Sequence, residues 1–471
     1  MLTYSEKYNT VMKIPCARLL PVFIAGFSFL EPALTNIQYQ NLTLIATALV
    51  LGSKFKLTEI SCMWLKDKSV SALSEFLSDA KISTHEMQQL YLLRMRHLYK
   101  TETGYFLIDD TMVHHTKFCK WIHGVSILFD HALGTNLKAK CIVFLYYSDG
   151  NGKKYFIDFR IFYKEDCKMP WKKGPKNIHK TKYELAIEMI EASLNNGFPA
   201  CTVLADSWFG IDPFVKELKR LKLNYILEIK TKNKVRKNCD KPKLTPTGKL
   251  SKNQYELKSF KDFFNMMAFY QVCGFATDKK TGKKEKVLYH TKTATVRLNA
   301  ISGKHRLVES VDPIKQTTKY LLTNELTWEA TKIISAYSNR WAIEEFFRNA
   351  KQLTDMEGAT IRSEQGVTLA LYLVSWIDSL LHYENYKQSI AGKLPKESLT
   401  IPSIVRQLQH ENLEMVLKRV QSDEDFVVKW LKVTQNNINR TRKKCNDLIF
   451  LEKSDSYQEG LIARQQCLYQ S

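Results

Sequence analysis

The feature that most constrains the fold lies between residues 105 and 229, where strand patterns and helix patterns alternate. The first strand patterns are runs of apolar, β-branched and aromatic residues at Tyr105–Asp109, Lys138–Tyr147 and Tyr155–Tyr163. A turn rich in Gly and Asn at 148–152 separates the second run from the third, which predicts a hairpin. We therefore expect three antiparallel strands at the start of this region.

Strands and helices then alternate along the chain. Helical spacing of apolar residues or short apolar runs predict a helix at Lys182–Leu194, a strand at Cys201–Asp206, a helix at Asp212–Leu221 and a strand at Tyr225–Ile229. Antiparallel strands that lead into strand–helix–strand order are typical of a mixed sheet with helices on its faces. The fold class that we predict is therefore α/β.

The first hundred residues show helical periodicity. Apolar residues recur at helical spacing in Leu42–Leu51, Val70–Leu77 and Met87–Leu98, and Ser83 is placed to begin the third helix. Short helices that carry basic residues fit a DNA-reading module of helix-turn-helix type. A generic helical bundle fits the same pattern equally well.

A β-rich insertion and a long helix follow the α/β region. Nine lysines and arginines but one acid, Asp240, lie between residues 230 and 252, and a solvated loop explains such a run as well as a DNA contact does. Short strands are then predicted at Tyr270–Ala276, Lys286–His290, Thr293–Leu298 and Tyr320–Leu322. Thr327 is expected to cap a helix with its body at Ala330–Lys351, and the remainder is mainly helical.

These patterns divide the chain into five segments. They are a helical DNA-binding domain at 1–100, the first part of the α/β core at 101–230, the β-rich insertion at 231–322, the helix-bearing second part of the core at 323–385 and a C-terminal helical region at 386–471.

Charge and cysteine spacing narrow the function classes. The 471 residues include 70 Lys or Arg and 48 Asp or Glu, so the net charge is +22. This excess exceeds that of an average cytosolic enzyme of small metabolites and indicates a polyanionic partner, most often nucleic acid, with an acidic membrane surface as the alternative. The 10 cysteines include no C-x-x-C pair, which argues against a zinc ribbon or a disulfide scaffold and fits a reducing cytoplasm.

Two apolar stretches, Leu19–Leu30 and Gly366–Ile377, could suggest a membrane or secretion signal. Gly366–Ile377 is shorter than the roughly 20 apolar residues that span a bilayer. Leu19–Leu30 resembles the apolar region of a signal peptide, but its N-terminal flank lacks the usual layout of one. Both stretches are therefore predicted to be buried helices.

Two of the predicted strands end in aspartate. The segments are Leu107-Ile108-Asp109-Asp110-Thr111 and Leu204-Ala205-Asp206-Ser207. Active sites of α/β sheets gather at strand ends, although turns also favour Asp. These aspartates are therefore candidate catalytic residues, but a catalytic role becomes convincing only if a third acidic side chain accompanies them.

The long predicted helix supplies that group. At about 100° per residue, six side chains fall within an arc of about 100°: Tyr337, Arg340, Trp341, Glu344, Arg348 and Lys351. A solvated face, with Glu344 paired to Arg340 and Arg348, would also explain this stripe. Glu345 lies about 90° from its centre and is the poorer third acid. Three carboxylates from two strands and one helix could hold two divalent cations for phosphodiester displacement, with cationic side chains on the phosphates.

The spacing Tyr337-(2)-Arg340-(3)-Glu344-(6)-Lys351 resembles the signature of the DDE transposases of bacterial insertion sequences, in the IS-four-like group. The resemblance covers about residues 105–380 and implies a ribonuclease H-like core. It also implies that Asp109, Asp206 and Glu344 are catalytic and bind two Mg²⁺ ions, for which Mn²⁺ can substitute. The family pattern D-x-[TS] favours Asp109 over Asp110 as the first acid.

The resemblance further implies a DNA interface and a reaction. Tyr337, Arg340 and Lys351 would contact DNA near the transposon end, and Arg348 and Trp341 share their face. The protein would cut and paste DNA in the bacterial cytoplasm, at the nucleoid, as a homodimer in a synaptic complex with terminal inverted repeats and target DNA. No membrane partner is expected. Two alternatives stay open: a nuclease of the same fold without strand transfer, and an inactive DNA-binding derivative.

Some residues stay unassigned at this point. In the family an aromatic side chain of the insertion can stack on a flipped base, but Trp328, Tyr320 and Tyr289 are only guesses for it. His114 and His115 follow the first acidic strand without a metal-ligand spacing, so a structural or phosphate-contacting role is the better interpretation.

Overall fold

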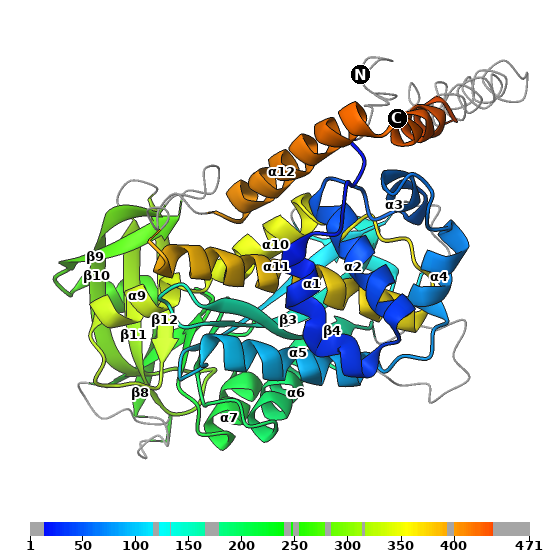
Figure 1. Ribbon diagram of the computed structural model, residues 1–471. Helices are drawn as coiled ribbons and strands as arrows, with labels where there is room; N and C mark the ends of the chain where they lie inside the picture. Colours follow the sequence, from blue (N-terminus) through cyan, green and yellow to red (C-terminus); the bar gives the residue numbers. More distant parts are fainter. Residues whose placement is uncertain are drawn as a thin grey trace, which may run out of the picture.

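The computed structural model describes residues 14–115, 122–131, 133–164, 179–239, 246–247, 254–277, 284–312, 316–392 and 400–436. A large mixed sheet runs through the molecule, with helices packed on its faces, so the predicted α/β class is confirmed (Figure 1).

Five strands form the core of this sheet. They are β1 (Tyr105–His114), β3 (Thr135–Ser148), β4 (Lys154–Phe162), β5 (Thr202–Ala205) and β6 (Tyr225–Glu228). Their order is β4-β3-β1-β5-β6, with antiparallel pairing from β4 to β1 and parallel pairing from β1 to β6. This is the arrangement of a ribonuclease H-like sheet. The short strand β2 (Ser126–Asp130) pairs antiparallel with the first part of β3, at residues 135–139.

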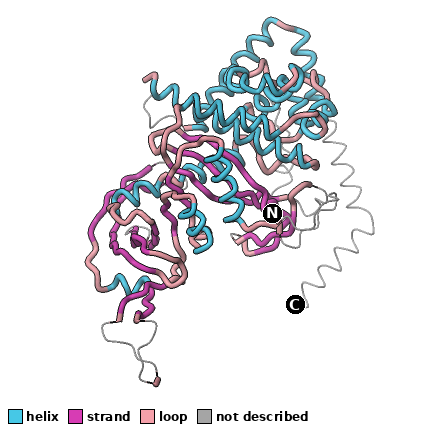
Figure 2. The backbone as a smooth tube through the Cα atoms, turned by 90° about the horizontal axis from the view of Figure 1, so that it is seen from below, coloured by secondary structure: helices cyan, strands magenta, loops and turns pink. Residues whose placement is uncertain are grey.

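Most strands of the insertion continue the same sheet, and its first two strands form a separate two-stranded sheet. Its elements are β7 (Lys234–Asn238), β8 (Tyr255–Ser259), α8 (Phe260–Asn265), β9 (Tyr270–Thr277), β10 (Lys284–Arg297), β11 (Lys304–Asp312) and β12 (Thr317–Thr323). Strand β12 pairs antiparallel with β6, and the insertion strands gather at one end of the molecule (Figure 2). Because β12 of the insertion is hydrogen-bonded directly to β6 of the core, the sheet shows no boundary between the two parts. The domain boundaries at 230 and 322 therefore remain a proposal.

Two details of the insertion differ from the prediction. The strands predicted at Lys286–His290 and Thr293–Leu298 are one strand, β10, because Thr291 between them is buried and fits a strand as well as its neighbours do. Part of the basic run forms β7, which pairs with β8. Residues 240–245 and 248–252 of that run lie outside the described residues.

Helices cover the sheet. They are α1 (Pro21–Phe27), the 3₁₀ helix η1 (Ser28–Ala33), α2 (Asn36–Val50), α3 (Leu57–Met63), α4 (Val70–Ser78), α5 (Thr84–Tyr99), α6 (Lys182–Asn195), α7 (Asp212–Arg220), α9 (Ala330–Ser338), α10 (Trp341–Gln352), α11 (Glu364–Ile390) and α12 (Ile401–Ser422). Ser83 caps α5 as predicted, through a hydrogen bond from the Glu86 amide.

The N-terminal helices share one hydrophobic core with the sheet. The ring of Tyr91 in α5 lies 5.7 Å from that of Trp376 in α11, and the Trp376 indole donates a 2.9 Å hydrogen bond to Gln88. Both apolar stretches form helices, as predicted. The stretch Gly366–Ile377 is buried within α11, whereas α1 and η1 bury Phe23, Phe27 and Leu30 and leave Ile24 exposed. In the described part of the chain no helix is long and apolar enough to cross a membrane.

The predicted helix Ala330–Lys351 is in fact two helices, α9 and α10, so the prediction of a single helix was wrong. At the break the amides of Asn339 and Arg340 bond three residues back, and the Asn339 side chain donates to the carbonyls of Ser335 and Ala336. Asn side chains compete with helical backbone bonds in this way. The first helix is capped at Glu329 and not at Thr327.

Candidate active site

Two aspartates meet at one edge of the sheet. The parallel pairing of β1 with β5 ends with Ile108 opposite Ala205, and Asp109 and Asp206 are the next residues. They therefore lie side by side, as expected for acids that follow neighbouring parallel strands. One correction concerns β1, which does not end at Asp109: it continues to His114 along β3.

The third acid reaches this edge from α10. The Arg340 guanidinium, which is 12% exposed, bridges two carboxylates: one nitrogen donates to Asp109 Oδ2 at 2.7 Å, and another pairs with Glu344. A single buried cation thus joins the first strand acid to the helix acid. Charge-assisted bonds of this kind fix geometry as well as contributing energy.

Asp109 and Asp110 point to different partners, because neighbouring residues of a strand face opposite ways. Asp110 pairs with Lys182 Nζ of α6 at 2.9 Å and accepts a hydrogen bond from Cys141. Asp109 therefore belongs to the cluster around Arg340, and Asp110 belongs to a separate ion pair.

The two neighbouring carboxylates of α10, Glu344 and Glu345, also have different partners. Glu345 is turned to the core, where Lys154 Nζ of β4 lies 3.0 Å away. Burial alone would raise the pKa of Glu345, but Lys154 holds it down at about 2. The positive charge of Arg348 also lowers the pKa of Glu345. Arg348, which was predicted to belong to the polar stripe around Glu344, therefore also interacts with Glu345.

Tyr337 lies inside the protein. Its hydroxyl group donates to Glu228 Oε2 at 3.2 Å and lies 3.4 Å from the carbonyl oxygen of Ala205, and the side chain is only 7% exposed. These contacts join the ends of β5 and β6 to α9. Burial places the pKa of Tyr337 well above its ordinary value, so the hydroxyl stays protonated as a donor.

The other residues of the predicted DNA-binding stripe occupy mixed environments. Lys351 Nζ donates to the carbonyl of Met112 at 2.7 Å and pairs with Glu357 at 3.1 Å. Trp341 is half-buried at the start of α10. His114 bonds Asp130 at 2.7 Å, which fits the structural role expected for it.

The carboxylates of the cluster perturb one another. Burial raises the pKa of Asp109 to about 7, Arg340 opposes this shift, and Asp206 adds to it. Burial also raises the pKa of Asp206, against a hydrogen bond from the Trp208 amide at 3.0 Å. Buried acids that repel one another are typical of sites that bind cations or transfer protons.

The chain was compared with known proteins. Residues 36–260 match the family model described as DDE superfamily endonuclease, and residues 171–377 match that described as transposase DDE domain. This chain belongs to the DDE transposase superfamily. No curated protein matches it. The matches make the protein an enzyme that cleaves nucleic acid, and DDE enzymes act on DNA with divalent metal ions.

The acids of this DDE transposase fit a divalent metal by donor type. Carboxylate oxygens suit hard cations, and a cation would relieve the repulsion that raises the Asp109 pKa. Their present arrangement is closed, since Arg340 lies between Asp109 and Glu344. Accordingly, no group of three His, Cys, Asp or Glu among the described residues could hold a metal as it stands. Arg340 supplies the positive charge instead.

Glu228 is a fourth acid that the sequence analysis missed. In the parallel pairing of β5 with β6, Ala205 lies opposite Leu227, so Glu228, the last residue of β6, lies beside Asp206, the first residue after β5. It accepts the Tyr337 hydrogen bond and pairs with Lys319 Nζ at 3.1 Å. The signal was present, because within the predicted strand Tyr225–Ile229 the apolar run 225–227 is followed by Glu228.

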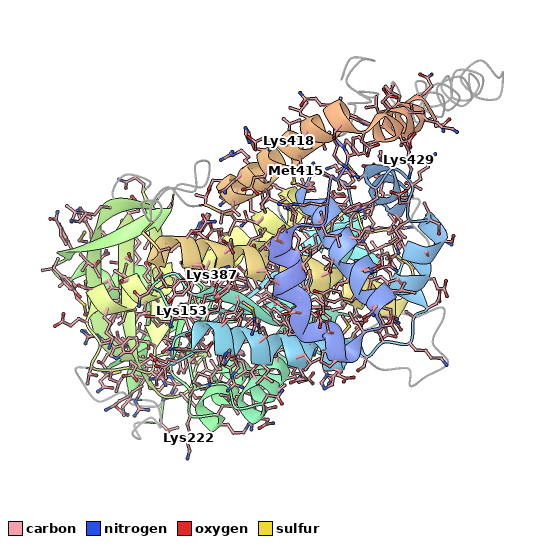
Figure 3. The ribbon with its side chains drawn as sticks, in the orientation of Figure 1. Lys153, Lys222, Lys387, Met415, Lys418 and Lys429 are labelled. Carbon is pink, nitrogen blue, oxygen red and sulfur yellow. The ribbon has the colours of Figure 1, made fainter. Side chains whose placement is uncertain are left out.

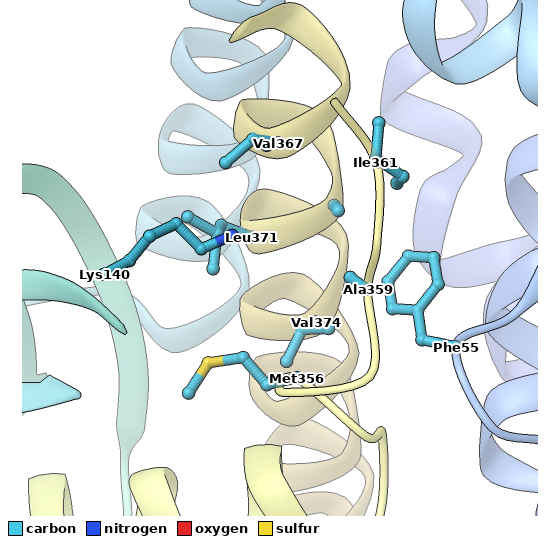
Figure 4. A pocket seen from close by; sticks show the side chains of 9 residues that line it. Phe55, Lys140, Met356, Ala359, Ile361, Val367, Leu371 and Val374 are labelled. Carbon is cyan, nitrogen blue, oxygen red and sulfur yellow. The ribbon is translucent and has the colours of Figure 1, made fainter. Parts of the chain in front are cut away.

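A pocket elsewhere in the transposase has no such chemistry. It lies between α11 and the loop that precedes it, and Figure 4 shows the side chains of Phe55, Met356 and Val374 around it, with Lys140 on the opposite wall. The other lining residues are apolar, and none of the four acids reaches it.

Proposed function

We propose that this chain is a cut-and-paste transposase that cleaves DNA at the ends of a mobile element and joins them to target DNA. The observation that carries the proposal is the convergence of Asp109, Asp206 and Glu344, from two parallel strands and one helix, around Arg340. The IS-four-like spacing from Tyr337 to Lys351 supports the assignment to that group.

In this proposal Asp109, Asp206 and Glu344 hold two Mg²⁺ ions, and Mn²⁺ can replace them. Bound metal would activate the attacking oxygen and stabilise the leaving oxygen in a phosphodiester displacement. Arg340 would release Asp109 and Glu344 if a bound cation neutralised their negative charge. Its guanidinium would then be available to bind a DNA phosphate.

The other site residues set positions. Tyr337 and Lys319 hold Glu228, and through it the end of β6 beside Asp206. The Trp208 amide, in the turn that follows β5, donates a hydrogen bond to the Asp206 carboxylate and so holds its orientation. A rigid second layer of this kind keeps ligands in the productive geometry.

Positive charge supports a DNA substrate. The chain carries a net charge of +22, and Figure 3 shows lysines such as Lys222, Lys418 and Lys429 extending from the surface. Arg348 and Lys351 add cations on the helix that bears Glu344. We infer that two DNA segments, a terminal inverted repeat and the target, bind in a synaptic homodimer at the nucleoid. Such binding would be steeply salt-dependent.

The test uses DNA that carries one end of the element, identified as inverted repeats flanking the gene. Wild-type protein with Mg²⁺ should nick the end and then give joined products with a target plasmid, both resolved on a denaturing gel. Nicking without joining would indicate the nuclease alternative. Absence of both, with DNA binding retained, would indicate an inactive derivative.

The variant arm of this test is Glu344→Gln, with Glu329→Gln as its matched control. Glu329 is an exposed acid at the start of α9, the neighbouring helix. Glu344→Gln should lower nicking by about a thousandfold or more, since it removes a ligand from the reacting centre. Wild-type nicking by Glu344→Gln would overturn the proposal.

A further inference from the structure

Glu345, the neighbour of the candidate metal ligand Glu344, ties α10 to the sheet. Its carboxylate lies 3.0 Å from Nζ of Lys154, the first residue of β4, and the side chains of Lys154 and Glu345 are 24% and 21% exposed. Successive residues of a helix point about 100° apart, so one turn of α10 presents Glu344 to the site and Glu345 to the sheet. A rotation of α10 that moved Glu344 would therefore also stretch the bond between Glu345 and Lys154.

Buried polar groups surround this ion pair. Asp378 of α11, which is 3% exposed, accepts a hydrogen bond from the Tyr146 hydroxyl of β3 at 3.0 Å. Burial raises the pKa of Asp378 to about 7, and the charge of Glu345 adds to this rise, whereas Asn349 of α10 and Lys154 oppose it. The ion pair thus lies in a buried polar layer between α10, α11, β3 and β4.

The hairpin turn that leads into Lys154 also contacts the start of α10. Gly150 in this turn has a φ of +79°, and a Cβ atom there would lie 3.3 Å from Oδ1 of Asn339, at the break between α9 and α10. Two backbone amides of the turn donate to Asp149 Oδ1, at 2.7 and 2.9 Å, and so hold its shape. One hairpin therefore supports α10 at two points, the break before it and Glu345.

Apolar packing already attaches α10 to the sheet. The centroid of the Phe346 ring lies 5.2 Å from that of Phe144 and 5.3 Å from that of Tyr146. A buried ion pair often stabilises a protein no more than apolar side chains of similar volume do. What the ion pair adds is direction, because a charge-assisted hydrogen bond has a defined length and angle. The pair therefore suits the orientation of α10 better than its attachment.

We propose that Lys154 is a positioning residue for the reaction: through Glu345 it sets the rotation of α10, and hence the distance of Glu344 from the two strand aspartates. The inference rests on the proposed function, which makes Glu344 a metal ligand. A displacement of about 1 Å in a reacting group can lower a rate about a hundredfold. The pair therefore governs the rate of strand cleavage and leaves the affinity for DNA unchanged.

The experiment replaces both charges by uncharged side chains of similar length, in Lys154→Met/Glu345→Met. Since no unpaired charge remains, the urea midpoint of unfolding should lie close to that of wild type. Nicking of the end DNA in Mg²⁺ should nevertheless have a kcat about a hundredfold lower, with a KM for DNA within about twofold of wild type. Lys154→Met alone should lose at least as much, and Lys154→Arg, which keeps the charge, should recover most of that loss.

The matched control is Lys292→Met/Glu309→Gln. These residues form a comparable pair between β10 and β11 of the insertion, 3.6 Å apart, with side chains that are 19% and 11% exposed. The glutamine keeps an acceptor for the Tyr320 hydroxyl, which donates to Glu309 at 3.0 Å. This variant should nick at the wild-type rate.

Three results would overturn the positioning role. They are a wild-type kcat in Lys154→Met/Glu345→Met, a loss confined to KM, and a Lys154→Arg variant no better than Lys154→Met.

A second arm needs neither metal nor cleavage. Hydrogen–deuterium exchange of the metal-free protein, measured by mass spectrometry without DNA, reports local opening of each element. The amides of α10 should exchange about tenfold faster in Lys154→Met/Glu345→Met than in wild type, and those of β1 and β5 at an unchanged rate. Equal exchange in α10 would overturn the proposal. Such a failure leaves the proposed reaction intact, and a wild-type protein that does not nick DNA leaves this arm decisive.

Discussion

The bridge formed by Arg340 predicts how the protein responds to metal ions. Replacing Arg340 with Gln removes two charge-assisted contacts and leaves Asp109 and Glu344 facing each other without a counter-charge. Loss of one partner of a fully buried ion pair costs about 3–5 kcal/mol. Because Glu344 is 29% exposed and recovers some hydration, we expect the metal-free protein to lose about 2 kcal/mol.

The metal-bound protein should differ. Without Arg340 no internal cation competes for the carboxylates, so Mg²⁺ should stabilise Arg340→Gln more than wild type. In thermal unfolding, Arg340→Gln without metal should melt about 2–3 °C below wild type, and saturating Mg²⁺ should recover at least that difference. Isothermal titration in the absence of DNA should show tighter Mg²⁺ binding by the variant.

The control for this prediction is Lys332→Gln, which removes an exposed cation of α9 that lies over the Trp328 ring. Its response to Mg²⁺ should equal that of wild type. The reasoning is refuted if Arg340→Gln binds Mg²⁺ as weakly as wild type or more weakly, because Arg340 would then support the metal site instead of occupying it.

Three further predictions concern residues around the site and in the sheet that carries it. Tyr337→Phe should leave DNA affinity in EDTA unchanged and lower the nicking rate about tenfold, with no further loss when Glu228→Gln is added, because the hydroxyl acts through Glu228; a loss of DNA affinity would assign Tyr337 to the DNA instead. Glu345→Gln should destabilise the protein by about 2 kcal/mol in urea unfolding, since it leaves the half-buried Lys154 without its carboxylate, and a variant as stable as wild type would contradict this role of the ion pair. Burial lowers the pKa of His305 to about 4, so the unfolded chain binds its proton first and His305 contributes a loss of stability as pH falls from about 6.5 to 4; His305→Gln should show a shallower fall in a pH series of urea titrations, and an equal slope would exclude this contribution.

The sequence was sufficient for those parts of the site that follow from strand pattern. An apolar run that closes in an acid located both Asp109 and Asp206, and the parallel pairing of β1 with β5 puts them together. The same rule would have located Glu228, had it been applied to the third run. Local alternation thus predicts which edge of a sheet carries the chemistry.

The helix acid shows where local reasoning stops. A single helical wheel through residues 337–351 put Tyr337, Arg340 and Glu344 on one face, but the break at Asn339 turns Tyr337 inward to Glu228. The break depends on side-chain bonds of Asn339 that compete with the helix. The periodicity of the segment contains no sign of it.

Contacts between distant segments were beyond the sequence altogether. Lys182 and Lys230 reach Trp208 from different elements, and Arg340 meets Asp109 across 231 positions of the chain. The packing of α5 on α11 likewise depends on the tertiary fold. The role of the N-terminal helices in reading DNA stays a prediction.

The most direct test of the central claim is a crystal structure of the protein soaked with Mn²⁺ and measured at the manganese edge. The account predicts anomalous peaks about 2.1 Å from carboxylate oxygens of Asp109, Asp206 and Glu344, with Arg340 moved away from both of its partners. An absence of peaks at these acids at saturating Mn²⁺, or Arg340 still bound to Asp109 and Glu344, would contradict it.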